Sequence, residues 1–188
     1  MVETNGRNFD LLTLGQVLLR LSPPDNERLS RGDTFVKQVG GAELNVAVGA
    51  ALLGLHTGVI SKLPAHDIGS FMKGKIRSFG VSDDFFMYDQ SPAARVGIYY
   101  YENGAYPRKP KVIYDRNHSS FFSLDIDEIP EEVYTASKCF HTTGITLALN
   151  EDIRETTIEM IKRFKAAGTL VSFDVNFRGN LWTGDQAR

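Results

Sequence analysis

Residues 40–54 read GGAELNVAVGAALLG, and this segment is the strongest indicator of the fold. The apolar and small residues of segment 43–53 predict a helix, and Gly54 is well placed to end it. The two glycines in front let a ligand approach the backbone, where free amides at a helix N-terminus suit polar or anionic groups. We expect Asn45 to meet a hydroxylated ligand from the first helical turn. The alternative is a plain tight turn with Asn45 in solvent.

The chain on either side of this stretch alternates between strand and helix patterns. Apolar runs bounded by turn residues predict a long strand or pair of strands at 9–21, broken at Gly15, and further strands at 34–39, 57–62, 139–142 and 170–174. Helical spacing of apolar residues predicts helices at 67–79, 130–137 and 150–167. This order predicts an α/β fold: a mostly parallel sheet with helices on both faces.

The region between residues 94 and 116 departs from this rhythm. Two β-rich runs, 95–101 and 111–115, flank a turn segment with Gly, Pro and Asn, which predicts a hairpin projecting from the sheet. Tyr114 and Arg116 share one face of their strand, and Tyr99 lies on the other arm. An aromatic wall with one arginine fits a small carboxylated or phosphorylated ligand. Ordinary edge-strand packing with a solvated arginine is the alternative.

Ligands in such folds bind at the carboxyl ends of the strands of a parallel sheet, and polar segments follow several of the predicted strands at these ends. Residues 143–144 and 174–178 occupy such positions, as the glycine pair does. Arg178 in the second segment is suited to neutralise a phosphate or a carboxylate. We therefore expect one ligand site at this edge.

Composition excludes several classes of protein. The 188 residues include 21 Lys plus Arg against 23 Asp plus Glu, a net charge of -2, which argues against a broad nucleic-acid surface. The longest apolar run, 46–55, is too short to span a membrane, and the single cysteine cannot form an internal disulfide. We expect a soluble, cytoplasmic protein. The dispersed histidines predict no metal site, and the G-x-x-x-x-G-K match at 69–75 lies in a helical pattern that does not suit a phosphate loop.

Three segments together resemble the ribokinase-like (PfkB) family of carbohydrate kinases. They are GGAELNVAVGAALLG at 40–54, SKLPAHDIG at 61–69 and DVNFRGNLW at 174–182, in the family's order and spacing. Within the family, the opening GQVLLRLSPPDNERL, the VIYDRNHSS run at 112–120 and the DVNFR run are most similar to 2-keto-3-deoxygluconate kinases.

The resemblance implies an enzyme that transfers the γ-phosphoryl group of ATP, with Mg²⁺, to a hydroxyl of a sugar acid, with 2-keto-3-deoxygluconate as the expected substrate. It implies a Rossmann-like sheet with a small β lid built from segments near 19–39 and 94–116. The residues implied to bind the substrate are Gly40, Gly41, Ala42, Asn45, Tyr99, Tyr114 and Arg116. Asn176 and Arg178 are implied to contact the nucleotide phosphates, and a homodimer through the lid is expected.

The sequence departs from the family pattern in two ways. Position 16 is Gln where related kinases more often have Glu, so we expect a different polar network at the end of the first strand. The family's Gly-Ala-Gly-Asp turn, with its catalytic Asp, is not in this sequence. We therefore predict no catalytic residue among residues 1–188. We interpret them as the N-terminal part of a kinase domain without its nucleotide-binding part, and expect the 188-residue chain alone to be inactive.

Two other readings fit the same residues. One is a fructokinase or another sugar or nucleoside kinase of this fold, although Arg116 and Arg178 together favour an anionic substrate. The other is a non-catalytic sugar-binding or dimerisation fragment, since the glycine turn, the tyrosines and the lid require no phosphoryl transfer.

Overall fold

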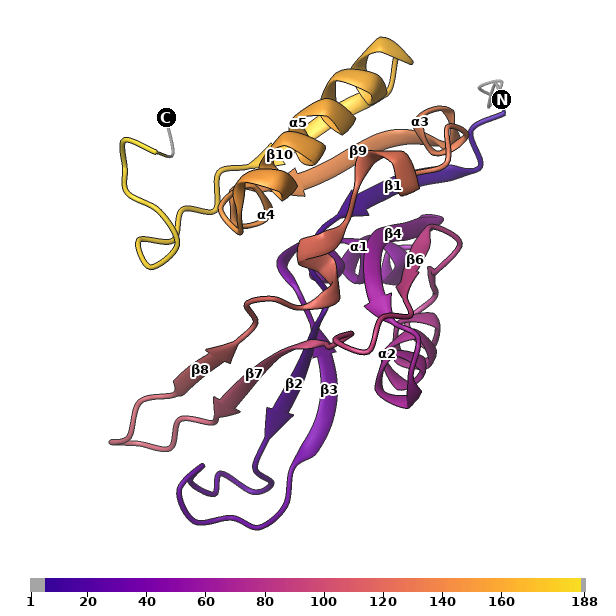
Figure 1. Cartoon of the computed structure of the whole chain (residues 1–188). Coiled ribbons are helices and arrows are strands. Elements are labelled where there is room, and N and C mark those ends of the chain that lie inside the picture. The colour runs from indigo at the N-terminus through magenta and orange to yellow at the C-terminus, as the bar shows by residue number, and fades with distance from the viewer. Residues whose placement is uncertain (1–5, 187–188) are drawn as a thin grey trace.

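The computed structural model describes residues 6–186 (Figure 1). Within them, a six-stranded sheet has the order β10-β9-β1-β4-β5, with β6 also paired to β4, and every pairing in it is parallel. Its strands are β1 (Phe9–Leu14), β4 (Thr57–Pro64), β5 (Val81–Ser82), β6 (Phe86–Asp89), β9 (Ser137–Thr143) and β10 (Leu170–Asp174). The carboxyl ends of these strands therefore meet at one edge of the sheet, as predicted.

Helices cover both faces of this sheet because neighbouring residues of each strand point to opposite sides. They are α1 (Ala42–Leu52), α2 (Asp67–Arg77), α3 (Val133–Ala136), α4 (Gly144–Leu147) and α5 (Glu151–Ala166). On one face, Leu12 of β1 lies beside Phe140 of β9, whose ring stacks on Phe164 of α5 at 4.1 Å between centroids. On the other face, Val59 of β4 packs in a second buried cluster with Ala47 of α1. The predicted fold class is confirmed.

A second sheet projects from the first (Figure 1). Its order is β3-β2-β7-β8, and its strands are β2 (Leu18–Ser22), β3 (Val36–Gly40), β7 (Gly97–Glu102) and β8 (Lys111–Asp115). The chain passes directly from β1 into β2 through residues 15–17, so the two sheets meet at the carboxyl end of β1. We call this four-stranded sheet the lid.

The predicted ends of α1 and α5 agree closely with the structure, whereas α2 ends at Arg77 rather than 79 and α3 covers only Val133–Ala136 of the helix predicted at 130–137. Gly41, with a φ of 151°, precedes α1, and Gly54, with a φ of 89°, follows it. The Asn150 side chain accepts a hydrogen bond from the Ile153 amide and caps α5, as its sequence position predicted. The G-x-x-x-x-G-K match lies inside α2, which confirms that it is no phosphate loop.

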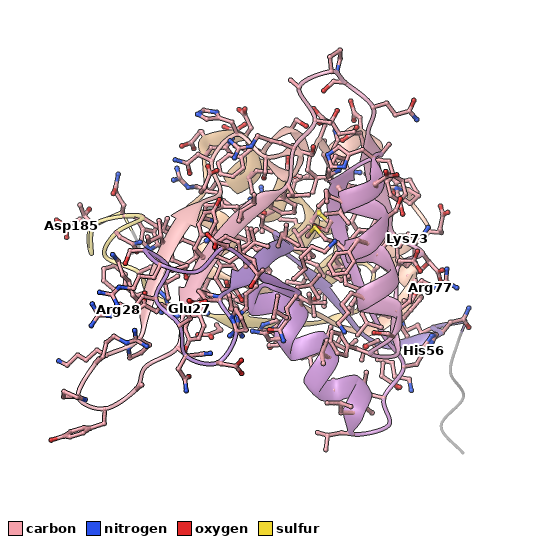
Figure 2. The ribbon with its side chains drawn as sticks, turned by 90° about the horizontal axis from the view of Figure 1, so that it is seen from below. Glu27, Arg28, His56, Lys73, Arg77 and Asp185 are labelled. Atoms are coloured by element: carbon pink, nitrogen blue, oxygen red, sulfur yellow. The ribbon has the colours of Figure 1, made fainter. Side chains whose placement is uncertain are left out.

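Helix α2 is tied to the chain that follows it by a shared carboxylate. Lys73 and Arg77 project from α2 (Figure 2). Their side-chain nitrogens lie 3.0 and 3.6 Å from the carboxylate of Asp83. Asp83 lies between β5 and β6, so these contacts hold the short edge strands near the helix. No helix in residues 6–186 has the length and apolar character needed to cross a membrane.

Candidate functional site

A cavity of about 300 Å³ lies between the carboxyl edge of the main sheet and the lid. Its lining includes seven residues that the sequence singled out: Gly41, Ala42, Asn45, Tyr99, Tyr114, Arg116 and Arg178. They come from α1 and the residue before it, from β7, from β8 and the residue after it, and from the chain after β10. Three segments that are far apart in the sequence thus form one site.

The glycine turn is shaped by close contacts that exclude side chains. A Cβ on Gly41 would lie 2.7 Å from the backbone oxygen of Gln16, and the φ of 151° there also favours glycine. A Cβ on Gly40 would overlap the Tyr99 hydroxyl, so Gly40 shapes the site without lining it. Asn45 is exposed on the first turn of α1 and faces the cavity.

Glu43, on the first turn of α1, is a buried acid at the edge of the cavity, with 2% of its surface exposed. Its Oε1 accepts hydrogen bonds from the hydroxyls of Thr143 (2.6 Å) and Thr146 (2.8 Å). These bonds join the start of α1 to the end of β9 and to α4. Glu43 therefore fixes two walls of the cavity against each other.

The lid forms an aromatic wall. Tyr99 and Tyr114 are register partners across β7 and β8, with ring centroids 5.9 Å apart. Burial raises the pKa of Tyr99 above its ordinary value, partly offset by the nearby Arg20 guanidinium, so its hydroxyl stays neutral and able to donate at neutral pH. Arg20 also lines the cavity, and its guanidinium lies 4.3 Å from the ring centroid of Tyr101.

Arg116 lies where the lid returns to the main sheet. Its Nε donates to Gln16 Oε1 at 2.7 Å, and its guanidinium lies 5.7 Å from the ring centroid of Tyr114. Burial lowers the pKa of Arg116, an effect that the negative charge of Glu43 opposes. Among residues 6–186, no carboxylate comes within ion-pair distance of this guanidinium. Arg116 is thus a partly buried cation that faces an open cavity without a counter-ion from the described chain.

A smaller cavity of about 220 Å³ adjoins this site and shares with it two of its three arginines, Arg116 and Arg178. Asn180 also lines it, which adds an amide able to bind an anion. Asn176 lines neither cavity. Its backbone N–H donates to Asp174 Oδ1 at 2.9 Å, and its backbone is left-handed, with a φ of 39°. Its contact with phosphates stays a prediction.

Sequence reasoning missed Arg20 and Glu43, and it noted Gln16 only as a departure from a family pattern. Arg20 interrupts an apolar strand, and Glu43 is an acid in an apolar helix, so each carried a detectable signal. A cavity of about 680 Å³ near Asp89 and His118 contains none of the predicted site residues. Residues 6–186 also contain no cluster of three His, Cys, Asp or Glu side chains that could hold a metal ion.

The sequence model described as pfkB family carbohydrate kinase matches residues 8–188. The chain belongs to the pfkB family of carbohydrate kinases. This pfkB chain is 38% identical over 179 residues to a 2-dehydro-3-deoxygalactonokinase of Haloferax volcanii, covering 95% of this chain and 55% of that protein. The matched part of this pfkB chain therefore spans about half the length of that relative.

Solved structures agree with this assignment to the pfkB family. A 2-dehydro-3-deoxygluconokinase from Thermotoga maritima is similar with a TM-score of 0.89 and 36% identity, over 95% of this chain and 54% of that one. An uncharacterized sugar kinase from Pyrococcus horikoshii, in complex with ATP, is similar with a TM-score of 0.80 and 26% identity, over 94% of this chain and 56% of that one. The fold and the family are thus supported by sequence and by structure.

Proposed function

We propose that this chain carries the substrate-binding part of a kinase that transfers the γ-phosphoryl group of ATP to a hydroxyl of a sugar acid. The expected substrate is 2-keto-3-deoxygluconate, which is also called 2-dehydro-3-deoxygluconate. The observation that carries the proposal is Arg116, a partly buried cation at the cavity whose charge has no ion-pair partner within the described residues.

A carboxylate is the ligand group that fits this environment. The planar guanidinium presents paired N–H donors that match the two oxygens of a carboxylate, and partial burial strengthens the resulting charge-assisted bonds. A neutral sugar offers no charge to offset the cost of keeping Arg116 partly out of water. The names of the relatives from Haloferax volcanii and Thermotoga maritima, both kinases of deoxy sugar acids, support the same assignment.

The other side chains of the cavity supply polar and aromatic contacts. Gly41 and Ala42 bring backbone groups to the cavity, and Asn45 adds an amide that can both donate to and accept from sugar hydroxyls. Tyr99 and Tyr114 close over the sugar from the lid. We assign these residues to the substrate.

We assign Arg178 and Asn176 to the phosphates of the nucleotide. Arg178 faces both cavities, and Asn180 lines the smaller one, so an anionic phosphate fits there better than an apolar group. ATP supplies the γ-phosphoryl group, and Mg²⁺ is expected to arrive with the nucleotide. The described residues contribute positioning and charge neutralisation, the effects on which phosphoryl transfer mostly depends.

Two further candidates remain as outcomes of a test. A fructokinase or nucleoside kinase of this fold would prefer a neutral substrate, and a non-catalytic sugar-binding fragment would bind the acid without any turnover. The product of the whole reading frame should be assayed with ATP, Mg²⁺, 2-keto-3-deoxygluconate and fructose. We expect phosphorylation of the acid and little of fructose. Preference for fructose, or no turnover of either substrate, would contradict this expectation.

We also infer a homodimer that forms through the lid. Strand β8 lies at one edge of the lid and is exposed along its whole length, including the apolar Val112 and Ile113. An exposed apolar edge strand favours pairing with a second chain. Sedimentation velocity should show a dimer that Ile113→Lys weakens, and a monomer at all concentrations would contradict the inference.

A further inference from the structure

Arg20 is the third arginine of the larger cavity, and it has no role in the proposed function. It lies on β2, where Tyr99 of β7 is its register partner, and Tyr99 in turn pairs with Tyr114 of β8. All three side chains line the cavity. The tyrosine pair therefore lies across the lid between Arg20 on one side and Arg116, which follows β8, on the other.

Contacts within the lid fix the direction of the Arg20 side chain. Its Nε donates a hydrogen bond to Ser22 Oγ at 2.9 Å, and Ser22 is itself buried. Its guanidinium carbon lies 4.3 Å from the ring centroid of Tyr101, so a cation–π contact also holds the planar group. Because the Nε–H is used inside the lid, a ligand in the cavity meets the Nη end of the guanidinium.

The charge of Arg20 has no ion-pair partner in the described part of the chain. No carboxylate of residues 6–186 comes within ion-pair distance of its guanidinium. The charged side chains that line the larger cavity are three arginines and one acid, Glu43. We assign Arg116 to the carboxylate of the substrate and Arg178 to the phosphates, which leaves Arg20 without an anion. A half-buried cation of this kind favours a ligand that brings a second negative charge.

Arg20 and Arg116 belong to different parts of the cavity. Arg116 and Arg178 also line the smaller cavity, whereas Arg20 does not. Strand β7 lies between β2 and β8, so at about 4.8 Å per strand spacing β2 and β8 are about 10 Å apart. The two guanidinium groups are also held by different partners, Ser22 for Arg20 and Gln16 for Arg116. The two arginines therefore suit two separate anionic groups rather than one.

We propose that Arg20 forms a second anion-binding subsite of the cavity, so that sugar dicarboxylic acids bind with one carboxylate at Arg116 and the other at Arg20. The second group is a carboxylate rather than a phosphate, because the phosphates are assigned to the Arg178 end of the site. The proposal rests on the proposed function, since it takes Arg116 as the subsite for the first carboxylate. Sugar dicarboxylic acids then compete with the sugar acid for the cavity.

Gluconate and glucarate test the proposal, because they have the same carbon chain but carry one carboxylate and two carboxylates respectively. Isothermal titration calorimetry gives the dissociation constant of each ligand. We expect glucarate to bind at least about tenfold more tightly than gluconate, since a hydrogen bond between charged groups is worth at least that factor. In Arg20→Gln this gain should disappear, while the affinity for gluconate stays within a few-fold of the wild-type value.

Two further variants show whether the gain depends on the charge at this place. Arg31→Gln makes the same change at an exposed arginine in the loop between β2 and β3, and it should leave the ratio of the two dissociation constants unchanged. Arg20→Lys keeps the charge but not the paired donors, so it should retain part of the gain.

The possible outcomes separate this inference from the proposed function. A wild-type protein that binds glucarate no more tightly than gluconate would overturn the inference alone, and this comparison needs no variant to fold. A gain for glucarate that survives in Arg20→Gln would overturn it as well. A wild-type protein that binds 2-keto-3-deoxygluconate no better than fructose would overturn the proposed function, and this inference with it.

Discussion

Replacing Arg116 with alanine is the most informative perturbation of the cavity. Truncating one partner of a buried, hydrogen-bonded charge pair costs about 2 to 5 kcal/mol. Arg116 is only partly buried, so we take about 3 kcal/mol, near the lower end of that range, which is a loss on the order of one hundredfold in affinity. The loss should apply to 2-keto-3-deoxygluconate, whereas fructose should lose no more than a few-fold, because it presents no carboxylate.

Isothermal titration calorimetry with both ligands measures this difference directly. Arg31→Ala is the matched control, since Arg31 is an exposed arginine in the loop between β2 and β3 and its removal changes the net charge equally. Arg116→Lys should give an intermediate loss, because lysine keeps the charge but not the paired donors or the bond to Gln16. Equal losses for the acid and for fructose in Arg116→Ala would refute the assignment of Arg116 to a carboxylate.

Three further predictions concern other parts of the chain. Gly41→Ala places a Cβ 2.7 Å from the backbone oxygen of Gln16, at a residue whose φ is 151°. The variant should therefore unfold at a lower temperature, and calorimetry should show weaker binding of acid and neutral sugars alike. Unchanged binding would contradict this prediction. Asn150→Ala removes the α5 cap and should lower the free energy of unfolding in urea by about 1 kcal/mol, while the capping variant Asn150→Asp should not. A hydrogen bond from Lys138 holds the pKa of Asp10 below its ordinary value of 3.8. The ionised Asp10 therefore stabilises the folded state fully above pH 3.8, and this contribution is lost as the pH falls toward the pKa of Asp10 in the folded protein. Asp10→Asn should be less stable than wild type at pH 6, with the difference shrinking below pH 3.8 in acid titrations, and a difference independent of pH would count against this account.

The long elements were predictable because their local periodicity is strong. The sequence predicted a helix at 150–167, and α5 spans Glu151–Ala166 with the predicted cap. The strands β5 and β6 were missed, since they have two and four residues and are too short to show a period. They form by pairing with β4, a contact that depends on the tertiary fold and not on their own sequence.

The site was predictable where local rules place side chains, and not where distant segments meet. Alternation along the hairpin placed Tyr114 and Arg116 on one face, and both line the cavity. The bonds between Gln16 and Arg116 join residues 100 positions apart, which no local pattern encodes. Asn176 follows β10 and lines neither cavity, with a left-handed backbone and a bond from its N–H to Asp174 Oδ1, so its contact with phosphates stays a prediction.

A crystal structure of this chain with bound 2-keto-3-deoxygluconate would show which residues bind the carboxylate. We predict that the carboxylate lies within hydrogen-bond distance of the Arg116 Nη groups, with sugar hydroxyls facing Gly41 and Asn45. A ligand seated in the larger cavity beside Asp89 and His118, or one whose carboxylate points away from Arg116, would contradict the account.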